Sequence, residues 1–156
     1  MLESDESWER LEVRLLPTPE LEAGAELTPV LNAFLSELEL FTLGPDWSQT
    51  GWHELTHEEA VRTLTYLLSE TMAYAQPKRE RLHARECALA FLALFGPSRR
   101  LLSNSDLHTV LLPDGSPPKT GWGYGSGRAL TPATFEGGIV VVGAGRIGLL
   151  WVTDED

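Results

Sequence analysis

Two motifs in this chain have the residue types and the spacing to do chemistry, and the first is His53-Glu54-Leu55-Thr56-His57. Two histidines four residues apart on one helix face can bind zinc, and the glutamate between them then activates a metal-bound water. The pattern is typical of a zinc metallopeptidase when both histidines lie in one helix and a third ligand is near. Three glutamates that no motif marks are available as that ligand: Glu70, Glu80 and Glu86.

The local sequence favours a different interpretation of this motif. Thr56 and Glu59 have the spacing of a capping box, which would begin a helix at His57. Gly51 lies two residues before His53 and is a poor residue for a helix interior. His53 then lies outside the helix, and the two imidazoles need not converge. We therefore expect no metal site and no bound cofactor, with the metallopeptidase as the alternative hypothesis.

The second motif, Gly143-Ala-Gly-Arg-Ile-Gly148, follows the apolar run Ile139–Val142 and matches the dinucleotide fingerprint G-x-G-x-x-G. That fingerprint needs a helix after its third glycine and an acidic residue about 20 positions further on. Only eight residues follow Gly148, too few for a helix, a strand and that acid. We therefore predict an antiparallel hairpin over residues 138–152, with its turn at Gly143-Ala144-Gly145 and no bound dinucleotide.

The charge of the chain is large and unevenly distributed. The net charge is −11, and residues 1–60 carry 14 acidic and two basic residues, a net charge of −12. This acidic field repels phosphate backbones and anionic membrane surfaces, which argues against nucleic acid and membranes as partners. It attracts a basic protein and speeds the encounter with it. The alternative is that the charge serves only solubility.

The basic residues form one cluster in the sequence: Lys78, Arg79, Arg81, Arg85, Arg99 and Arg100. Such a cluster could bind an anion or an acidic partner. We favour the simpler interpretation, a solvated face that pairs with the acidic first third of the chain.

Loop aromatics and the acidic last residues are the candidate contacts to a protein partner. They are Trp47, Trp52, Trp122, Tyr124, Asp154, Glu155 and Asp156. Aromatic side chains on glycine-rich loops are common at binding surfaces, and they also cap a core where loops cross it. The acidic residues could engage a basic partner or form a solvated tail.

The chain of 156 residues is predicted to fold as a single domain. Hydrophobic periodicity predicts helices over residues 29–40, 57–75 and 78–95. The third of these is predicted to bury Leu82, Leu89, Leu92 and Phe95. Residues 9–16 alternate weakly and suggest a strand, with a helix begun near Ser4 as the alternative, and residues 108–112 suggest another strand. This order predicts an α+β fold with three main helices followed by a small antiparallel sheet that ends in the hairpin.

The sequence also predicts a compartment. Cys87 is the only cysteine, so no internal disulfide can form. The first residues are acidic and lack the apolar segment of a signal peptide. The longest unbroken apolar run, residues 87–95, is far shorter than the ~20 residues that span a bilayer. We therefore expect a cytoplasmic protein.

The C-terminal part of the sequence resembles small acidic bacterial proteins of the toxin-immunity type. The residues that carry the resemblance are Gly121-Trp122, Thr131–Gly138 and Leu149–Asp156. The resemblance implies a compact cytoplasmic protein that binds and neutralises another protein, and it implies no particular site residue. We expect a non-enzymatic binding module, in its most specific form an immunity-type inhibitor of a basic toxin. The alternatives are the zinc metallopeptidase and a housekeeping or stress protein.

Overall fold

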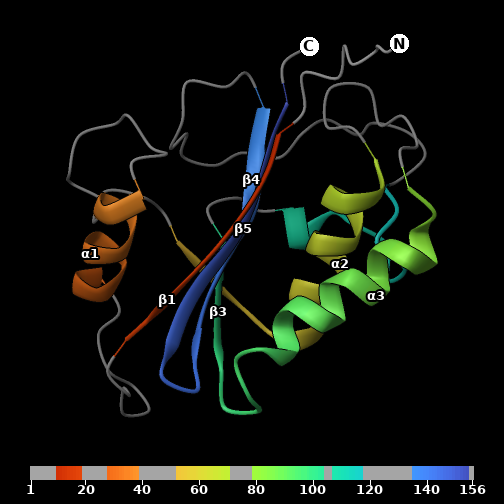
Figure 1. Cartoon of the computed structure of the whole chain (residues 1–156). Helices are drawn as coiled ribbons and strands as arrows, with labels where there is room; N and C mark the ends of the chain where they lie inside the picture. The colour runs from red at the N-terminus through yellow and green to blue at the C-terminus, as the bar shows by residue number, and fades with distance from the viewer. Residues whose placement is uncertain are drawn as a thin grey trace, which may run out of the picture.

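An antiparallel sheet forms the centre of the molecule (Figure 1). The computed structural model describes residues 10–18, 28–38, 52–70, 79–103, 107–117 and 135–154. Within these residues the sheet has five strands. In sheet order they are β1 (Arg10–Pro17), β5 (Arg146–Asp154), β4 (Phe135–Gly143), β3 (Arg100–Ser103) and β2 (His53–Leu55). All neighbouring strands are antiparallel, so β1 and β2 form the two edges.

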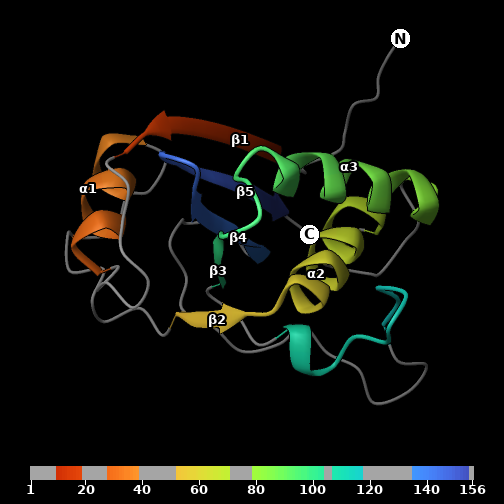
Figure 2. The same cartoon turned by 90° about the horizontal axis from the view of Figure 1, so that it is seen from below.

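Helices lie on both faces of this sheet (Figure 2). One face carries α1 (Thr28–Leu38), whereas α2 (His57–Ser69) and α3 (Arg81–Ala93) pack against each other on the opposite face. The short 3-10 helix η2 (Leu107–Thr109) contacts α2. The sheet is therefore the middle of three layers.

Each face of the sheet buries its own apolar cluster. Along β4, Ile139 and Val141 belong to the cluster beneath α2 and α3, whereas Val140 and Val142 belong to the cluster on the α1 side. A strand that is buried on both faces has a continuous apolar run instead of an alternating pattern. This double burial explains the unbroken run of branched residues that precedes the glycine motif.

The predicted C-terminal hairpin is confirmed. β4 and β5 pair over their whole length around the two-residue turn Ala144-Gly145, whose φ angles are 53° and 70°. Two left-handed residues are what a tight hairpin turn requires. A Cβ on Gly143 would overlap the backbone oxygen of Phe95, and a Cβ on Gly148 would overlap the ring of the same residue. Backbone conformation and close packing therefore account for all three glycines of the fingerprint.

The predicted order of three helices followed by a small sheet is wrong. β1 precedes every described helix, β2 lies between α1 and α2, and β3 follows α3. The sheet therefore draws its strands from both halves of the chain. Because β2 and β3 have only three and four residues, they are too short to show the alternation by which a strand is recognised.

The strand predicted over residues 108–112 is also wrong. Residues 107–109 form η2, and the backbone N–H groups of Val110 and Leu111 both donate to the carbonyl of Leu107. Leu107 and Leu111 are the buried residues of this segment. In a strand, Thr109 would lie on the same face as these two leucines, yet it is exposed, as expected for a helical turn.

The helix predictions hold in position and differ at the ends. α1 and α2 begin within one residue of the predicted starts, but α2 ends at Ser69 because Glu70 is extended, with φ −139° and ψ 150°. α3 begins at Arg81 instead of residue 78. Leu82, which was predicted to be buried, is 69% exposed, since it lies in the first turn on the outer side of α3.

Candidate protein-binding surface

An apolar hollow of about 360 Å³ lies between α1 and the end of β1. It is lined by Leu16, Pro17 and Thr18, by Pro29, Val30, Ala33, Phe34 and Glu37 of α1, and by Ile147 of β5. Glu37 is the only charged side chain among these described lining residues. The hollow can therefore accept an apolar group, and its one carboxylate favours a group with a positive charge nearby.

The register of β1 and β5 explains why this hollow forms. Leu16 pairs with Ile147, so both side chains point to the α1 face of the sheet. Pro17 and Pro29 restrict the backbone on either side of the hollow and leave no amide N–H to be satisfied there. Phe34 is buried at the base, and Ala33 is exposed beside it.

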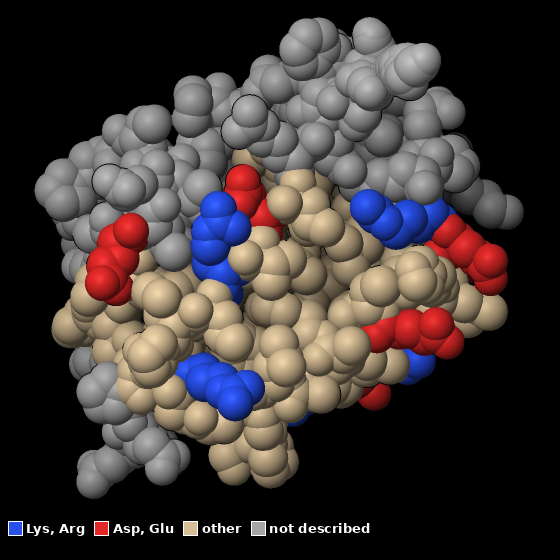
Figure 3. Space-filling model, in the orientation of Figure 1, with Lys and Arg blue, Asp and Glu red and all other residues tan. Residues whose placement is uncertain are grey.

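The opposite face of β1 exposes a row of large apolar side chains. Leu11, Val13 and Leu15 are 42%, 47% and 43% exposed, although their β5 partners Leu150 and Val152 are buried. In the described part of the chain, β5 is the strand that pairs with β1, and no strand lies beyond it. Figure 3 shows this side of the molecule, where a broad uncharged area separates the charged groups.

The H-E-x-x-H motif spans the junction between a strand and a helix. His53 and Glu54 lie in β2, and α2 begins at His57. Thr56 caps α2, and its hydroxyl accepts the Glu59 backbone N–H at 3.2 Å while the Glu59 carboxylate accepts the Thr56 N–H at 2.9 Å. That second hydrogen bond lowers the pKa of Glu59. The predicted capping box is therefore confirmed.

The glutamate of the motif is held by an arginine. Both oxygens of Glu54 accept hydrogen bonds from Arg100 on the neighbouring strand, at 2.9 and 2.7 Å. These hydrogen bonds hold the pKa of Glu54 below its ordinary value. A general base works best with a pKa near the working pH, so this pairing makes Glu54 a poor activator of water. Its evident role is to join β2 to β3.

The two histidines of the motif have different neighbours. Arg99 donates a hydrogen bond of 2.7 Å to Nδ1 of His57. The ring of His53 lies against that of His108 of η2, with centroids 5.5 Å apart. Among the residues that the structure describes, no three His, Cys, Asp or Glu side chains are grouped closely enough to hold a metal ion. The geometry thus gives the metallopeptidase hypothesis no support.

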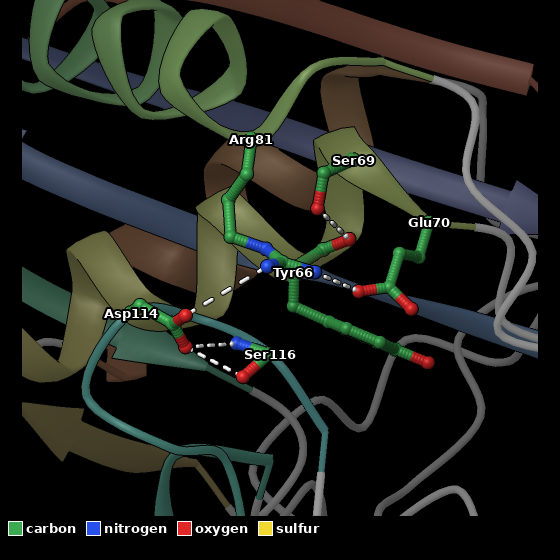
Figure 4. Close-up of polar contacts among 6 residues, drawn as sticks. All are labelled: Tyr66, Ser69, Glu70, Arg81, Asp114 and Ser116. Atoms are coloured by element: carbon green, nitrogen blue, oxygen red, sulfur yellow. Dashed lines mark hydrogen bonds and ion pairs between the residues drawn. The ribbon is translucent and has the colours of Figure 1, made fainter.

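Arg81, at the start of α3, contacts the end of α2 and the turn after η2 (Figure 4). Its guanidinium lies between Glu70, at 2.8 Å, and Asp114, at 3.7 Å. Glu70 is buried, with 6% of its surface exposed. Hydrogen bonds from the hydroxyl and the backbone N–H of Ser116 lower the pKa of Asp114. The contacts tie the start of α3 to the end of α2 and to the turn after η2.

The basic cluster of the sequence is not one surface. Arg79 donates a hydrogen bond to the carbonyl of Leu68, and Arg99 donates one to His57. Arg81 pairs with Glu70 and Asp114, which lie in the second and last thirds of the chain. Among the described ion pairs of the cluster, only that of Arg100 reaches an acid of the first 60 residues. Lys78 lies outside the described residues. The arginines therefore serve mainly as local connections.

Two of the seven predicted partner contacts lie in the described structure. Trp52 is half-buried and packs against the apolar cluster on the α1 side, so it closes the core instead of standing out from it. Asp154 ends β5. The remaining five, Trp47, Trp122, Tyr124, Glu155 and Asp156, lie outside the described residues. The partner-binding role of all seven stays a prediction.

Neither the hollow nor the exposed row was predicted from the sequence. The alternation of Leu11, Val13 and Leu15 predicts one face of a strand. The apolar face of an alternating strand is buried when another element packs on it, and it stays exposed when the strand lies at an uncovered edge of the sheet. That difference depends on the pairing of β1 with β5, which the sequence does not specify.

Comparison of the chain with protein-family models, curated proteins and solved structures gives no match. Within the described residues, no helix combines the length and the apolar character needed to cross a bilayer. The assignment of a function therefore depends on the geometry and the charge of this chain alone.

Proposed function

We propose that this protein is a protein-binding module, and that a basic partner inserts an apolar side chain into the hollow between α1 and β1. The hollow itself carries the proposal. Its volume of about 360 Å³ falls at the lower end of the ~300–1,000 Å³ typical of ligand sites. A single large side chain, seated in a pocket that excludes water, is a common energetic centre of a protein interface.

The charge of the chain supports a basic partner. All of the lining residues except Ile147 come from the first 60 residues, which have a net charge of −12. This field would raise the rate of encounter with a basic protein, and Glu37 at the hollow would hold a lysine or arginine beside the apolar anchor. An immunity-type inhibitor of a basic toxin is the most specific form of this proposal, and its cytoplasmic location is part of it.

The test uses two matched alanine-to-tryptophan variants. Ala33→Trp fills the hollow from an exposed position on α1, and Ala90→Trp adds the same side chain at an exposed position on α3. Tagged wild-type chain and both variants are used to capture partners from the native host. The captured protein is then purified, and its binding rates are measured at several salt concentrations.

We expect the wild type and Ala90→Trp to bind a protein of high isoelectric point that Ala33→Trp does not bind. The association rate should fall steeply between about 50 and 500 mM salt, because exposed charges are screened over ~8–10 Å at physiological ionic strength. Equal binding by both variants would refute the role of the hollow. An acidic partner, or a rate that salt does not change, would refute the role of charge.

A further inference from the structure

The outer edge of β1 has the features of an interface. The strand is eight residues long and ends at Pro17, and in the described structure its pairing partner is β5 on the inner side only. The guanidinium of Arg14 bonds the carbonyl of Val13 at 3.1 Å, in an exposed position. A long edge strand with an exposed apolar row is a template for pairing with another strand.

The sequence of β1 is complementary to itself. When two copies pair antiparallel about a two-fold axis at Val13, Leu11 lies opposite Leu15 of the second copy, and the two Val13 residues face each other. Directly opposed side chains in an antiparallel pair lie about 4.5–5.5 Å apart. The two exposed rows therefore merge into one apolar patch across the axis. On the other face, Glu12 lies opposite Arg14 of the second copy, and Arg14 lies opposite Glu12.

The neighbouring registers lack this complementarity. Centring the axis on Glu12 places the two Glu12 carboxylates together and Arg10 against Arg14, and centring it on Arg14 places two guanidinium groups together. Like charges directly opposite each other destabilise a strand pair. Registers with the axis between two residues are excluded, because hydrogen-bonding groups that point outward alternate along a strand. Registers centred on Leu11 or Leu15 pair only three or five residues of the strand, whereas the register centred on Val13 pairs seven, residues 10–16. Charge, backbone geometry and the length of strand paired thus favour the register centred on Val13.

We propose that β1 pairs with β1 of a second copy of this chain in the register centred on Val13. The product is a two-fold dimer in which the two sheets become continuous, and its interface patch is the same on both subunits. Within one chain, Arg14 already pairs with Glu12 at 2.7 Å, so the dimer forms a cluster of four alternating charges around the axis. The dimer site lies on the outer edge of β1. It shares the end of this strand with the proposed binding hollow, which Leu16 lines, but the charged residues Glu12 and Arg14 do not line the hollow.

The expected affinity is modest. Pairing of one edge strand buries less than the ~1,600 Å² of a standard stable interface, and each copy has a net charge of −11, which repels the other. We therefore expect micromolar dissociation, measured best at about 300 mM salt, where the repulsion is screened. Sedimentation velocity over a range of concentrations gives the dissociation constant.

Exchange of charge tests the register. In the Glu12→Arg chain, every charged side chain on that face of β1 is basic, and in the Arg14→Glu chain positions 12 and 14 are both acidic. The dissociation constant of each variant alone should be at least about tenfold higher than that of the wild type. An equimolar mixture should restore a heterodimer, because every opposed pair is then of opposite charge. Glu86→Arg, an exposed charge change on α3, is the control and should dimerise like the wild type.

The mixture result separates the proposal from a loss of folding, since an unfolded variant could not be rescued by its counterpart. Far-UV circular dichroism checks each chain. A monomeric wild type at millimolar concentration would overturn the proposal. So would single variants that dimerise as the wild type does, or a mixture that stays monomeric.

Cross-linking gives an independent measurement. With Cys87→Ser as the background, Val13→Cys places two thiols opposite each other across the axis. The opposed Cβ atoms lie about 4.5–5.5 Å apart, close enough for a disulfide after a small shift of the strands. Leu11→Cys places each thiol opposite Leu15 of the second copy. We expect rapid oxidation to a covalent dimer for Val13→Cys and slow oxidation for Leu11→Cys. The reverse order, or equal rates, would refute this register.

Discussion

Replacing Gly148 with alanine tests the structural explanation of the glycine fingerprint. The new Cβ would overlap the edge of the Phe95 ring and lie 3.0 Å from Cδ1 of Leu15. Phe95 has no exposed surface and therefore little room to move. Overpacking of this kind costs about 1–3 kcal/mol, and the reduced freedom of the unfolded chain offsets about 0.4–1 kcal/mol of it.

We expect Gly148→Ala to lower the free energy of unfolding by about 1–2 kcal/mol, which corresponds to roughly 2–8 °C in Tm for a chain of this length. Gly145→Ala is the matched control. Its Cβ would meet its nearest neighbour, the backbone oxygen of Thr18, at an ordinary 3.7 Å, so the cost comes from its φ of 70°. That left-handed conformation costs an alanine about 1 kcal/mol.

A double-mutant cycle distinguishes the two causes. Phe95→Leu removes the edge of the ring and should recover at least about 1 kcal/mol in the Gly148→Ala background, whereas its effect should add to that of Gly145→Ala within about 0.5 kcal/mol. Urea denaturation followed by tryptophan fluorescence measures all of these values. Equal coupling in both backgrounds, or a Gly148→Ala chain as stable as the wild type, would refute the packing argument.

Three further predictions concern the polar contacts. Thr56→Ala removes the cap of α2 and should cost about 1 kcal/mol in urea denaturation, whereas Thr56→Ser should cost little. Arg81→Ala leaves the buried carboxylate of Glu70 without its cation and should lower the free energy of unfolding by about 2 kcal/mol. Glu70→Gln in the same chain should restore a part of this loss. Additive effects of the two substitutions would contradict this coupling. Arg100 lowers the pKa of Glu54 in the folded state. The pairing of Glu54 with Arg100 therefore stabilises the fold above the ordinary glutamate pKa, and this stabilisation is lost as the pH falls through the lowered pKa of the folded state. The difference in stability between wild type and Glu54→Gln should therefore shrink as the pH falls below about 4.5, and a difference that is constant with pH would contradict it.

Local signals in the sequence predicted local structure well. The capping box at Thr56 and Glu59 placed the start of α2 correctly, and the glycines after Ile139–Val142 placed the hairpin correctly. Both signals depend on residues that lie within a few positions of one another. Their physical causes, capping of free N–H groups and left-handed turn conformations, act without the rest of the fold.

Features that depend on distant pairing could not be predicted. β2 and β3 become strands because Leu55 meets Leu101 across the sheet, and three or four residues carry no pattern of their own. The hollow needs α1 and the end of β1 to lie together, which follows from the pairing of β1 with β5. Trp52 illustrates the same limit, because its position in a predicted loop is compatible with exposure and with capping of the core, and its packing against the core makes it half-buried.

The pairing of β1 with β5 also has a consequence for the order in which the chain folds. Of the described elements, β1 is synthesised first, and its partner strand is synthesised last. Contacts between such distant segments form slowly, because a long loop must close before any hydrogen bond is gained. A nascent chain therefore presents both edges of β1 to its surroundings until β5 is made, whereas in the folded protein β5 covers one of them. Attachment of this strand should be a late event in folding, and the interval before it is when the chain is most exposed to aggregation.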